Sequence, residues 1–282
     1  MQNTNQTPKW LDLFIIAFGA QGLIALAWWA GAFHAQRIRE LQATYPILQI
    51  TGGAGVGKST LVANLWKMAG SEGESRNADS CSMGALLAIL VRTVNRPVVL
   101  EETGRGDERF DWTALRECYT GGAIVRHIGT EAIEGARFGG ALAYVGGETE
   151  VLNSRIVNVH LPLQRRTAEG RDAIEALHGL QIADMANFVE TIKANREQLA
   201  YRLGGVGRYI DSLQEDTEQR LPAGIDRNHA QLLALLDLLF DLFQVPAEAI
   251  HLAHAEVWNM AWQHVPGKTD FAVFKVEPGS TN

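Results

Sequence analysis

The sequence predicts an α/β fold, in which a core of alternating strands and helices has helical segments before and after it. Residues 45 to 162 alternate short apolar runs with helical spacing, as expected of a parallel sheet with helical crossovers. Residues 10 to 44 and 167 to 265 show helical patterns throughout. We therefore expect four parts: an N-terminal helical collar (1–44), an α/β core (45–165), a C-terminal helical subdomain (166–266) and a tail (267–282).

Apolar runs of strand length and helical periodicity define the elements of the core in order. We expect strands at residues 47–50, 96–103, 123–129, 140–146 and 155–161, the third and fourth flanking a hairpin-like excursion. We expect helices at 61–68 and 85–94, a short helix capped by Asp111 with Trp112 and Leu115 facing inward, and a buried helix at 229–243. Residues 76–83 have the composition of a loop.

Composition places the chain among ordinary globular proteins. Of its 282 residues, 46% are hydrophobic, which suits one α/β domain with a helical extension. The net charge is −7, so any contact with nucleic acid must be local, because proteins that coat duplex DNA are normally basic. Two cysteines do not make a disulfide framework, which favours a reducing cytoplasm.

Residues 13 to 33 form an uncharged apolar segment about as long as a membrane-spanning helix. Gly19, Gln21 and Gly22 fall in its middle and argue against a span. A buried helical hairpin that covers the sheet or a subunit interface explains the segment as well, and we favour burial over a membrane. The segment is not a typical signal peptide, since no charged start and small-residue cleavage site frame it.

The most specific motif follows the first predicted strand. Gly52, four further residues, Gly57, Lys58 and Ser59 fit G-x-x-x-x-G-K-[ST], between a strand and a helix. In that geometry backbone N–H groups and the helix dipole favour phosphate. Lys58 would reach the β- and γ-phosphates and Ser59 would ligate Mg²⁺. The expected nucleotide-binding residues are Gly52, Gly53, Ala54, Gly55, Val56, Gly57, Lys58, Ser59 and Thr60; the alternative is a glycine-rich turn without a ligand.

Two glutamates offer the groups that hydrolysis needs. The apolar run "PVVLEE" places Glu101 and Glu102 at the carboxyl edge of the sheet. The glycine motif lies at the same edge, because it follows the first strand. One carboxylate would belong to the Mg²⁺ shell and the other would polarise water. The pattern leaves open which does which; Glu101 is taken as the metal ligand beside Ser59. The alternative is a pair of ordinary acids at an exposed strand end.

The order of several segments resembles superfamily 3 helicases. The resemblance is closest to the helicase-like ATPase part of phage, plasmid and integrative-element primase–helicases, which often carry a TOPRIM primase. It covers roughly residues 13 to 245, and after the glycine motif it rests on "RPVVLEET" (96–103), "FDWTALRECYTGGAIVRHIG" (110–129), "RFGGALAYVGG" (137–147) and "NSRIVNVHLP" (153–162). It implies an AAA+-like P-loop core that uses ATP and Mg²⁺ and works as a ring, usually a hexamer, on single-stranded DNA.

The chain departs from this family at the sensor position. A polar residue, often Asn, usually follows the fourth core strand, whereas Gly146 and Gly147 stand here. Either Glu148 or Thr149 serves as the sensor, or sensing of the γ-phosphate is weakened. No primase region precedes residue 1, so we expect a stand-alone module or a piece of a larger product.

The resemblance also implies a DNA-contacting hairpin before the sensor strand. The segment 124–140 fits by position and carries Arg126, His127 and Arg137. A few cations repeated around a ring would concentrate positive potential in its pore, although the net charge of the chain is negative. A solvated hairpin is the alternative, favoured by Glu131 and Glu134.

Arg155 is the last candidate residue. In the family, an arginine at the matching place completes a nucleotide site, often that of the neighbouring subunit. We expect Arg155 on the same sheet edge as the glycine motif; the alternative is a salt bridge to Glu148 or Glu150.

The expected function is ATP hydrolysis coupled to movement on single-stranded DNA during replication of a mobile element. A non-hydrolysing, nucleotide-gated assembly or DNA-loading module is the rival. A membrane-tethered ATPase is a third possibility.

Overall fold

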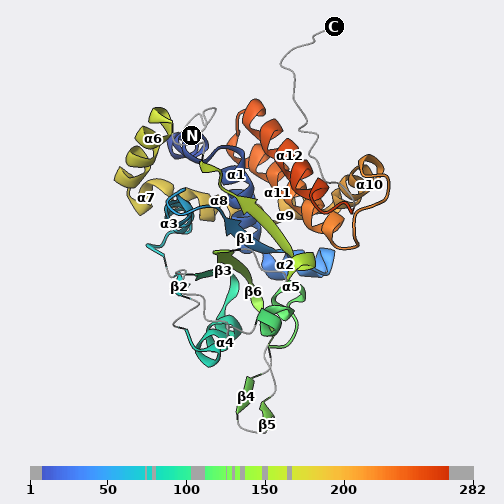
Figure 1. Ribbon diagram of the computed structural model, residues 1–282. Helices are drawn as coiled ribbons and strands as arrows, with labels where there is room; N and C mark the ends of the chain where they lie inside the picture. Colours follow the sequence, from blue (N-terminus) through green and yellow to red (C-terminus); the bar gives the residue numbers. More distant parts are fainter. Residues whose placement is uncertain are drawn as a thin grey trace.

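The computed structural model describes residues 8–73, 75–77, 81–102, 112–124, 126–128, 131–133, 137–147, 152–163 and 167–266. Its centre is a five-stranded parallel sheet with the order β2-β3-β6-β1-β7 (Figure 1). The strands are β1 (Ile47–Thr51), β2 (Arg76–Asn77), β3 (Val94–Glu101), β6 (Gly139–Val145) and β7 (Ile156–His160). The α/β class is as the sequence predicts, although β2 lies in a segment expected to be a loop.

The register of the strands aligns their carboxyl ends at one edge of the sheet. Thr51 at the end of β1 pairs with His160 at the end of β7. Glu101 at the end of β3 pairs with Val145 at the end of β6. Because β6 lies between β3 and β1, the residues that follow these strands meet along one line.

Helices cover both faces of the sheet. On one face, α3 (Lys58–Met68) packs with α1 (Lys9–Ala32), α8 (Asn187–Ala194) and α11 (Ile225–Phe243) in a core that includes Val99 and Val157. On the other, α4 (Met83–Arg92), the 3₁₀ helix η1 (Trp112–Leu115) and α5 (Glu117–Thr120) cover Val98 and Tyr144. Alternate residues of β1, β3, β6 and β7 thus serve two separate hydrophobic clusters, as the two-residue period of a strand requires.

The apolar N-terminal segment is a buried core helix. Helix α1 packs against α6, α11 and α12, and its backbone leaves helical geometry at Gly19. Among the described residues it is the one helix long and apolar enough to cross a membrane, yet 72% of its most apolar 18-residue window is buried within the protein. Its apolar side chains are therefore satisfied by the protein core. Residues 13–33, where a helical hairpin was expected, form two helical stretches that meet at the non-helical residue Gly19 (φ 56°, ψ −146°), and α2 (Ala35–Gln42) follows them.

The C-terminal part is entirely helical where the structure describes it. Arg202 holds the long buried helix α11 by donating from Nε to Asp241 over 2.6 Å, and Tyr209 donates its hydroxyl to Asp237 over 2.5 Å. Burial lowers the pKa of His229, also on α11, to about 4, so this imidazole is neutral. The remaining helices are α6 (Ala168–Gly179), α7 (Ile182–Met185), α9 (Arg196–Gly204), α10 (Val206–Asp216) and α12 (Ala247–Trp262).

A small hairpin stands apart from the main sheet. Strands β4 (Arg126–Ile128) and β5 (Glu131–Ile133) pair with each other in an antiparallel sheet and project from the lower end of the molecule in Figure 1. An isolated antiparallel bridge joins Ala123 to Arg137 at the hairpin's base. The strand expected at 123–129 is present as β4, but it lies outside the main sheet, because β4 pairs with β5 and the sheet continues directly from β3 to β6.

Candidate functional site

The loop from Gly52 to Gly57, here called the glycine loop, connects β1 to α3 at the carboxyl edge of the sheet. Gly52 and Gly57 have positive φ angles of 137° and 102°. A Cβ atom on Gly52 would also lie 2.6 Å from the carbonyl oxygen of Leu161. Glycine is thus required at Gly52 by backbone conformation and by the close approach of the chain that leaves β7.

The start of α3 is built to receive an anion. Its N-cap is Gly57, which offers no side-chain cap, so the first-turn N–H groups are not satisfied by a capping side chain. Lys58 Nζ folds back over the glycine loop and donates to the carbonyl oxygens of Gly52 and Gly53 over 2.6 and 3.1 Å. A cation, a bare helix N-terminus and a glycine loop therefore converge, which is a favourable environment for phosphate.

The two glutamates leave β3 on opposite faces of the sheet. Glu101 follows Val99 by two residues, and Val99 belongs to the core that also contains Leu61 and Leu65 of α3. The alternation of a strand therefore places Glu101 on the face covered by α3, where Ser59 occupies the first helical turn. Glu101 and Ser59 supply oxygen ligands of the kind that Mg²⁺ prefers, so the residues present fit this metal.

The carboxylate of Glu102 is held by the end of β6. Tyr144 donates its hydroxyl to Glu102 Oε2 over 2.7 Å, and the backbone N–H of Gly147 donates to the same oxygen over 2.8 Å. The ring of Trp112 packs edge-on against Tyr144, with 4.4 Å between centroids. Glu102 is thus oriented by two donors and a packed aromatic ring.

This arrangement explains the glycine at the position after β6. A Cβ atom on Gly146 would lie 2.6 Å from Glu102 Oε2 and 2.5 Å from the hydroxyl oxygen of Tyr144. Any side chain at Gly146 would therefore collide with the carboxylate. Glu102 occupies the space that a polar sensor side chain would otherwise fill. Glu148 and Thr149, the predicted sensors, lie outside the described residues.

Further polar side chains lie at the same edge, and the sequence reading missed them. Gln49 donates from Nε2 to the carbonyl oxygen of Gly147 over 2.7 Å. Thr51 donates its hydroxyl to Asn158 Oδ1 over 2.9 Å and lies 3.1 Å from Nδ1 of His160. The available signal was the polar residues at alternate positions of the apolar runs "ILQIT" and "IVNVH", all on one face of the sheet.

Arg155 lies at the opposite edge of the sheet, contrary to the expectation. It ends the 3₁₀ helix η2 (Asn153–Arg155), and the next residue, Ile156, pairs with Ile47 at the start of β1. A residue that precedes a parallel strand lies at its amino end, whereas the glycine loop follows β1. The two edges are about 13 Å apart over four residues of strand. Arg155 is therefore placed away from the glycine loop of its own chain.

The three residues predicted to contact DNA lie on or beside the hairpin. Arg126 and His127 belong to β4, and Arg137 is exposed at the hairpin's base. The structure thus groups these positions at the far end of the molecule from α1 and α6 (Figure 1).

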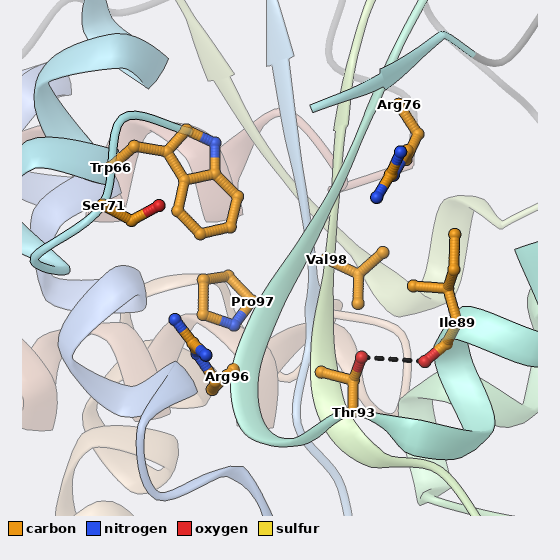
Figure 2. Close-up of a pocket in the computed structure, with 8 residues that line it drawn as sticks. All are labelled: Trp66, Ser71, Arg76, Ile89, Thr93, Arg96, Pro97 and Val98. Carbon is orange, nitrogen blue, oxygen red and sulfur yellow. Dashed lines mark hydrogen bonds between the residues drawn. The ribbon is translucent and has the colours of Figure 1, made fainter. Parts of the chain in front are cut away.

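A cavity of about 120 Å³ lies elsewhere, at the open outer edge of β3. Figure 2 shows Arg76 and Arg96 approaching it from opposite sides, and Thr93 donating to the carbonyl oxygen of Ile89 over 2.8 Å. The cavity lies near the amino end of β3 and the last turn of α3, away from Lys58 and Glu101. It is separate from the predicted nucleotide site. Its lining is Trp66, Ser71, Arg76, Ile89, Thr93, Arg96, Pro97 and Val98.

Comparisons with known proteins point to helicases. No known protein family and no curated protein matches the sequence. The solved structure of SCCmec type IV Cch, described as an active helicase, matches with a TM-score of 0.64 and 15% identity over 88% of this chain and 50% of that one. The JCV helicase matches at a TM-score of 0.35 and 16% identity, over 89% and 70%, which is too loose to add to the argument. The chain has a helicase-type fold and spans about half the length of Cch.

Proposed function

We propose that this chain is an AAA+-like P-loop ATPase that couples ATP hydrolysis to movement along single-stranded DNA. The observation that carries the proposal is the convergence of Lys58 and the two glutamates at one edge of a parallel sheet. Lys58 begins α3 and the glutamates lie at the end of β3, so only the folded chain brings them together. The helicase-type fold supports an NTPase of the helicase kind. In keeping with the sequence resemblance, we place its work in the replication of a mobile element, with a primase as a candidate partner.

The glycine loop would hold the phosphates of the nucleotide. The first-turn N–H groups of α3 would donate to phosphate oxygens, because no side chain caps this helix end. Lys58 would exchange the carbonyl oxygens of Gly52 and Gly53 for phosphate oxygens. Its ammonium is thus already poised over the loop.

The two glutamates would have different roles, one at the metal and one at the attacking water. Ser59 and Glu101 share the face covered by α3 and would hold Mg²⁺, which supplies positive charge to the phosphate oxygens. Glu102 would orient the attacking water and accept its proton. Tyr144 and the N–H of Gly147 would fix the direction of that carboxylate.

A second candidate function is a nucleotide-gated assembly or DNA-loading module with weak or no hydrolysis. The hydrogen bonds of Glu102 favour this second function. Tyr144 and the N–H of Gly147 both donate to Oε2 of Glu102, and this makes the carboxylate a weaker base. The second function is also favoured by the glycines at Gly146 and Gly147, which offer no side chain to sense a γ-phosphate.

The rate of ATP hydrolysis with and without single-stranded DNA, at several salt concentrations, separates the two candidates. A motor should be stimulated by DNA, and the stimulation should fade with salt as phosphate contacts are screened. A loading module should turn over slowly and ignore DNA.

Lys58→Ala should abolish hydrolysis while the thermal unfolding of the protein is unchanged, because the hydrogen bonds of Lys58 within the described part of the chain go to carbonyl oxygens of the glycine loop. Lys193→Ala, which removes an exposed lysine on α8, is the matched control and should hydrolyse ATP normally. Unchanged turnover in Lys58→Ala would remove the proposal.

A further inference from the structure

A group of three polar side chains beside the glycine loop has no part in the phosphate binding and hydrolysis proposed for Lys58 and the glutamates. Thr51 is the residue before Gly52 and is 4% exposed. His160, its partner in the register of β1 and β7, is exposed at the carboxyl end of β7. Asn158 lies two residues earlier on the same face of the sheet. The group therefore reaches from the buried strand to the surface next to the predicted nucleotide site.

The hydrogen bonds of this group determine which nitrogen of His160 carries its proton. Thr51 donates its single hydroxyl hydrogen to Asn158 Oδ1 over 2.9 Å. The contact of 3.1 Å between Thr51 Oγ1 and His160 Nδ1 then requires the imidazole to be the donor. A neutral imidazole with its hydrogen on Nδ1 has a bare lone pair on Nε2. In its neutral form His160 thus presents a hydrogen-bond acceptor, and not a donor, beyond the end of the sheet.

The order of the strands places His160 on the nucleoside side of the site. The glutamates that would act at the γ-phosphate end lie at the carboxyl end of β3, and β6 separates β3 from β1. β7 flanks β1 on the other side. The base and the γ-phosphate are the two ends of a nucleotide, so a nucleotide held by the glycine loop with its γ-phosphate toward β3 directs its base toward β7.

We propose that His160 selects the base of the bound nucleotide, using Nε2 to accept a hydrogen bond from the 6-amino group of adenine. Guanine carries an oxygen at that place, and two facing acceptors repel each other. Thr51 and Asn158 are positioning residues, because they hold His160 in the tautomer that accepts. The inference rests on the proposed function and adds the choice of adenine over guanine nucleotides.

The test compares the affinities for ATP and GTP, measured by displacement of a fluorescent ADP analogue. The native protein should prefer ATP by roughly tenfold, the value of one hydrogen bond. His160→Ala should weaken ATP binding by that factor and leave GTP binding unchanged or stronger, so that the preference disappears. His251→Ala, an exposed histidine on α12, is the matched control and should keep the preference.

Thr51→Val separates base selection from a structural role. Valine keeps the shape of the side chain but removes the hydroxyl that accepts from Nδ1, which frees the imidazole to turn a donor outward. This variant should keep its affinity for ATP within a few-fold and gain affinity for GTP.

The outcomes are distinguishable. If the native protein binds ATP and GTP equally, or if His160→Ala keeps the preference or lowers both affinities alike, the inference is overturned while the phosphate site stands. If the native protein binds no nucleotide at all, the proposed function fails and this inference fails with it.

Discussion

At the scale of single residues, the carboxylate of Glu102 and the hydroxyl of Tyr144 form the contact on which the proposed chemistry depends most. Two donors and the packing of Trp112 fix the carboxylate against the end of β6. The absence of a side chain at Gly146 is a requirement of this contact, since a Cβ would lie 2.6 Å from the Glu102 oxygen. The departure from the expected polar sensor thus has a steric reason.

We predict that Tyr144→Phe lowers kcat by roughly tenfold and leaves KM nearly unchanged. A hydrogen bond to a charged group contributes about 1.5–3 kcal/mol, and the variant removes one from Glu102, the group proposed to orient water, without touching the glycine loop. Steady-state kinetics would measure the split. Tyr201→Phe, on a side chain that is 71% exposed, serves as the control. A kcat equal to that of the native protein would show that Tyr144 does not position Glu102.

At the scale of elements, two features connect the proposed nucleotide site to the rest of the chain. Lys67, in the last turn of α3, donates to the carbonyl oxygens of Leu177, His178 and Leu180 over 3.0–3.2 Å. It thereby ties the helix that follows the glycine loop to the C-terminal end of α6. On the other side of the site, the chain between β3 and β6 carries the β4–β5 hairpin, so the strands with Glu101 and Tyr144 also carry the candidate DNA contact.

We predict that replacing residues 126–133 with a short glycine–serine turn keeps basal ATP hydrolysis but abolishes its stimulation by single-stranded DNA. The hairpin pairs with itself, apart from the main sheet, so its loss leaves the strand order intact. Hydrolysis rates and DNA binding at several salt concentrations are the measurements. Arg137→Ala should weaken DNA binding severalfold, whereas Arg92→Ala on α4 should not. Full DNA stimulation in the hairpin replacement would place the DNA contact elsewhere.

At the scale of the whole molecule, Arg155 and the glycine loop lie at opposite edges of one sheet. The separation of about 13 Å removes a contact within the chain but suits a molecule that offers one edge to each of two neighbours. A ring of identical subunits would bring the Arg155 edge of one chain to the nucleotide of the next. A guanidinium there would meet the charge that develops on the γ-phosphoryl oxygens.

We predict that ATP hydrolysis rises more than linearly with protein concentration and that Arg155→Ala reduces it by roughly 10³–10⁵. Mixing Arg155→Ala with Lys58→Ala protein should restore part of the activity, because a mixed interface can join an intact glycine loop to an intact Arg155. Sedimentation would establish whether rings form. If rings form and the mixture stays inactive, Arg155 is not an intersubunit finger.

The amino-acid sequence alone predicts the α/β class, the strand–loop–helix around Lys58 and the position of the glutamates at a strand end. These features depend on the periodicity of apolar residues and on the spacing of glycines within one motif, so a short stretch of sequence is enough to predict them. The remaining arrangement depends on contacts between distant parts of the chain. The apolar segment at residues 13–33 is buried because α6, α11 and α12 cover it. The sequence of the segment alone does not show which helices pack against it. Arg155 lies at the amino end of β7, and not at the carboxyl edge, because β7 pairs in parallel with β1. Tyr144, Thr51 and His160 joined the site because contacts between distant strands depend on register, and register exists only once the sheet has formed.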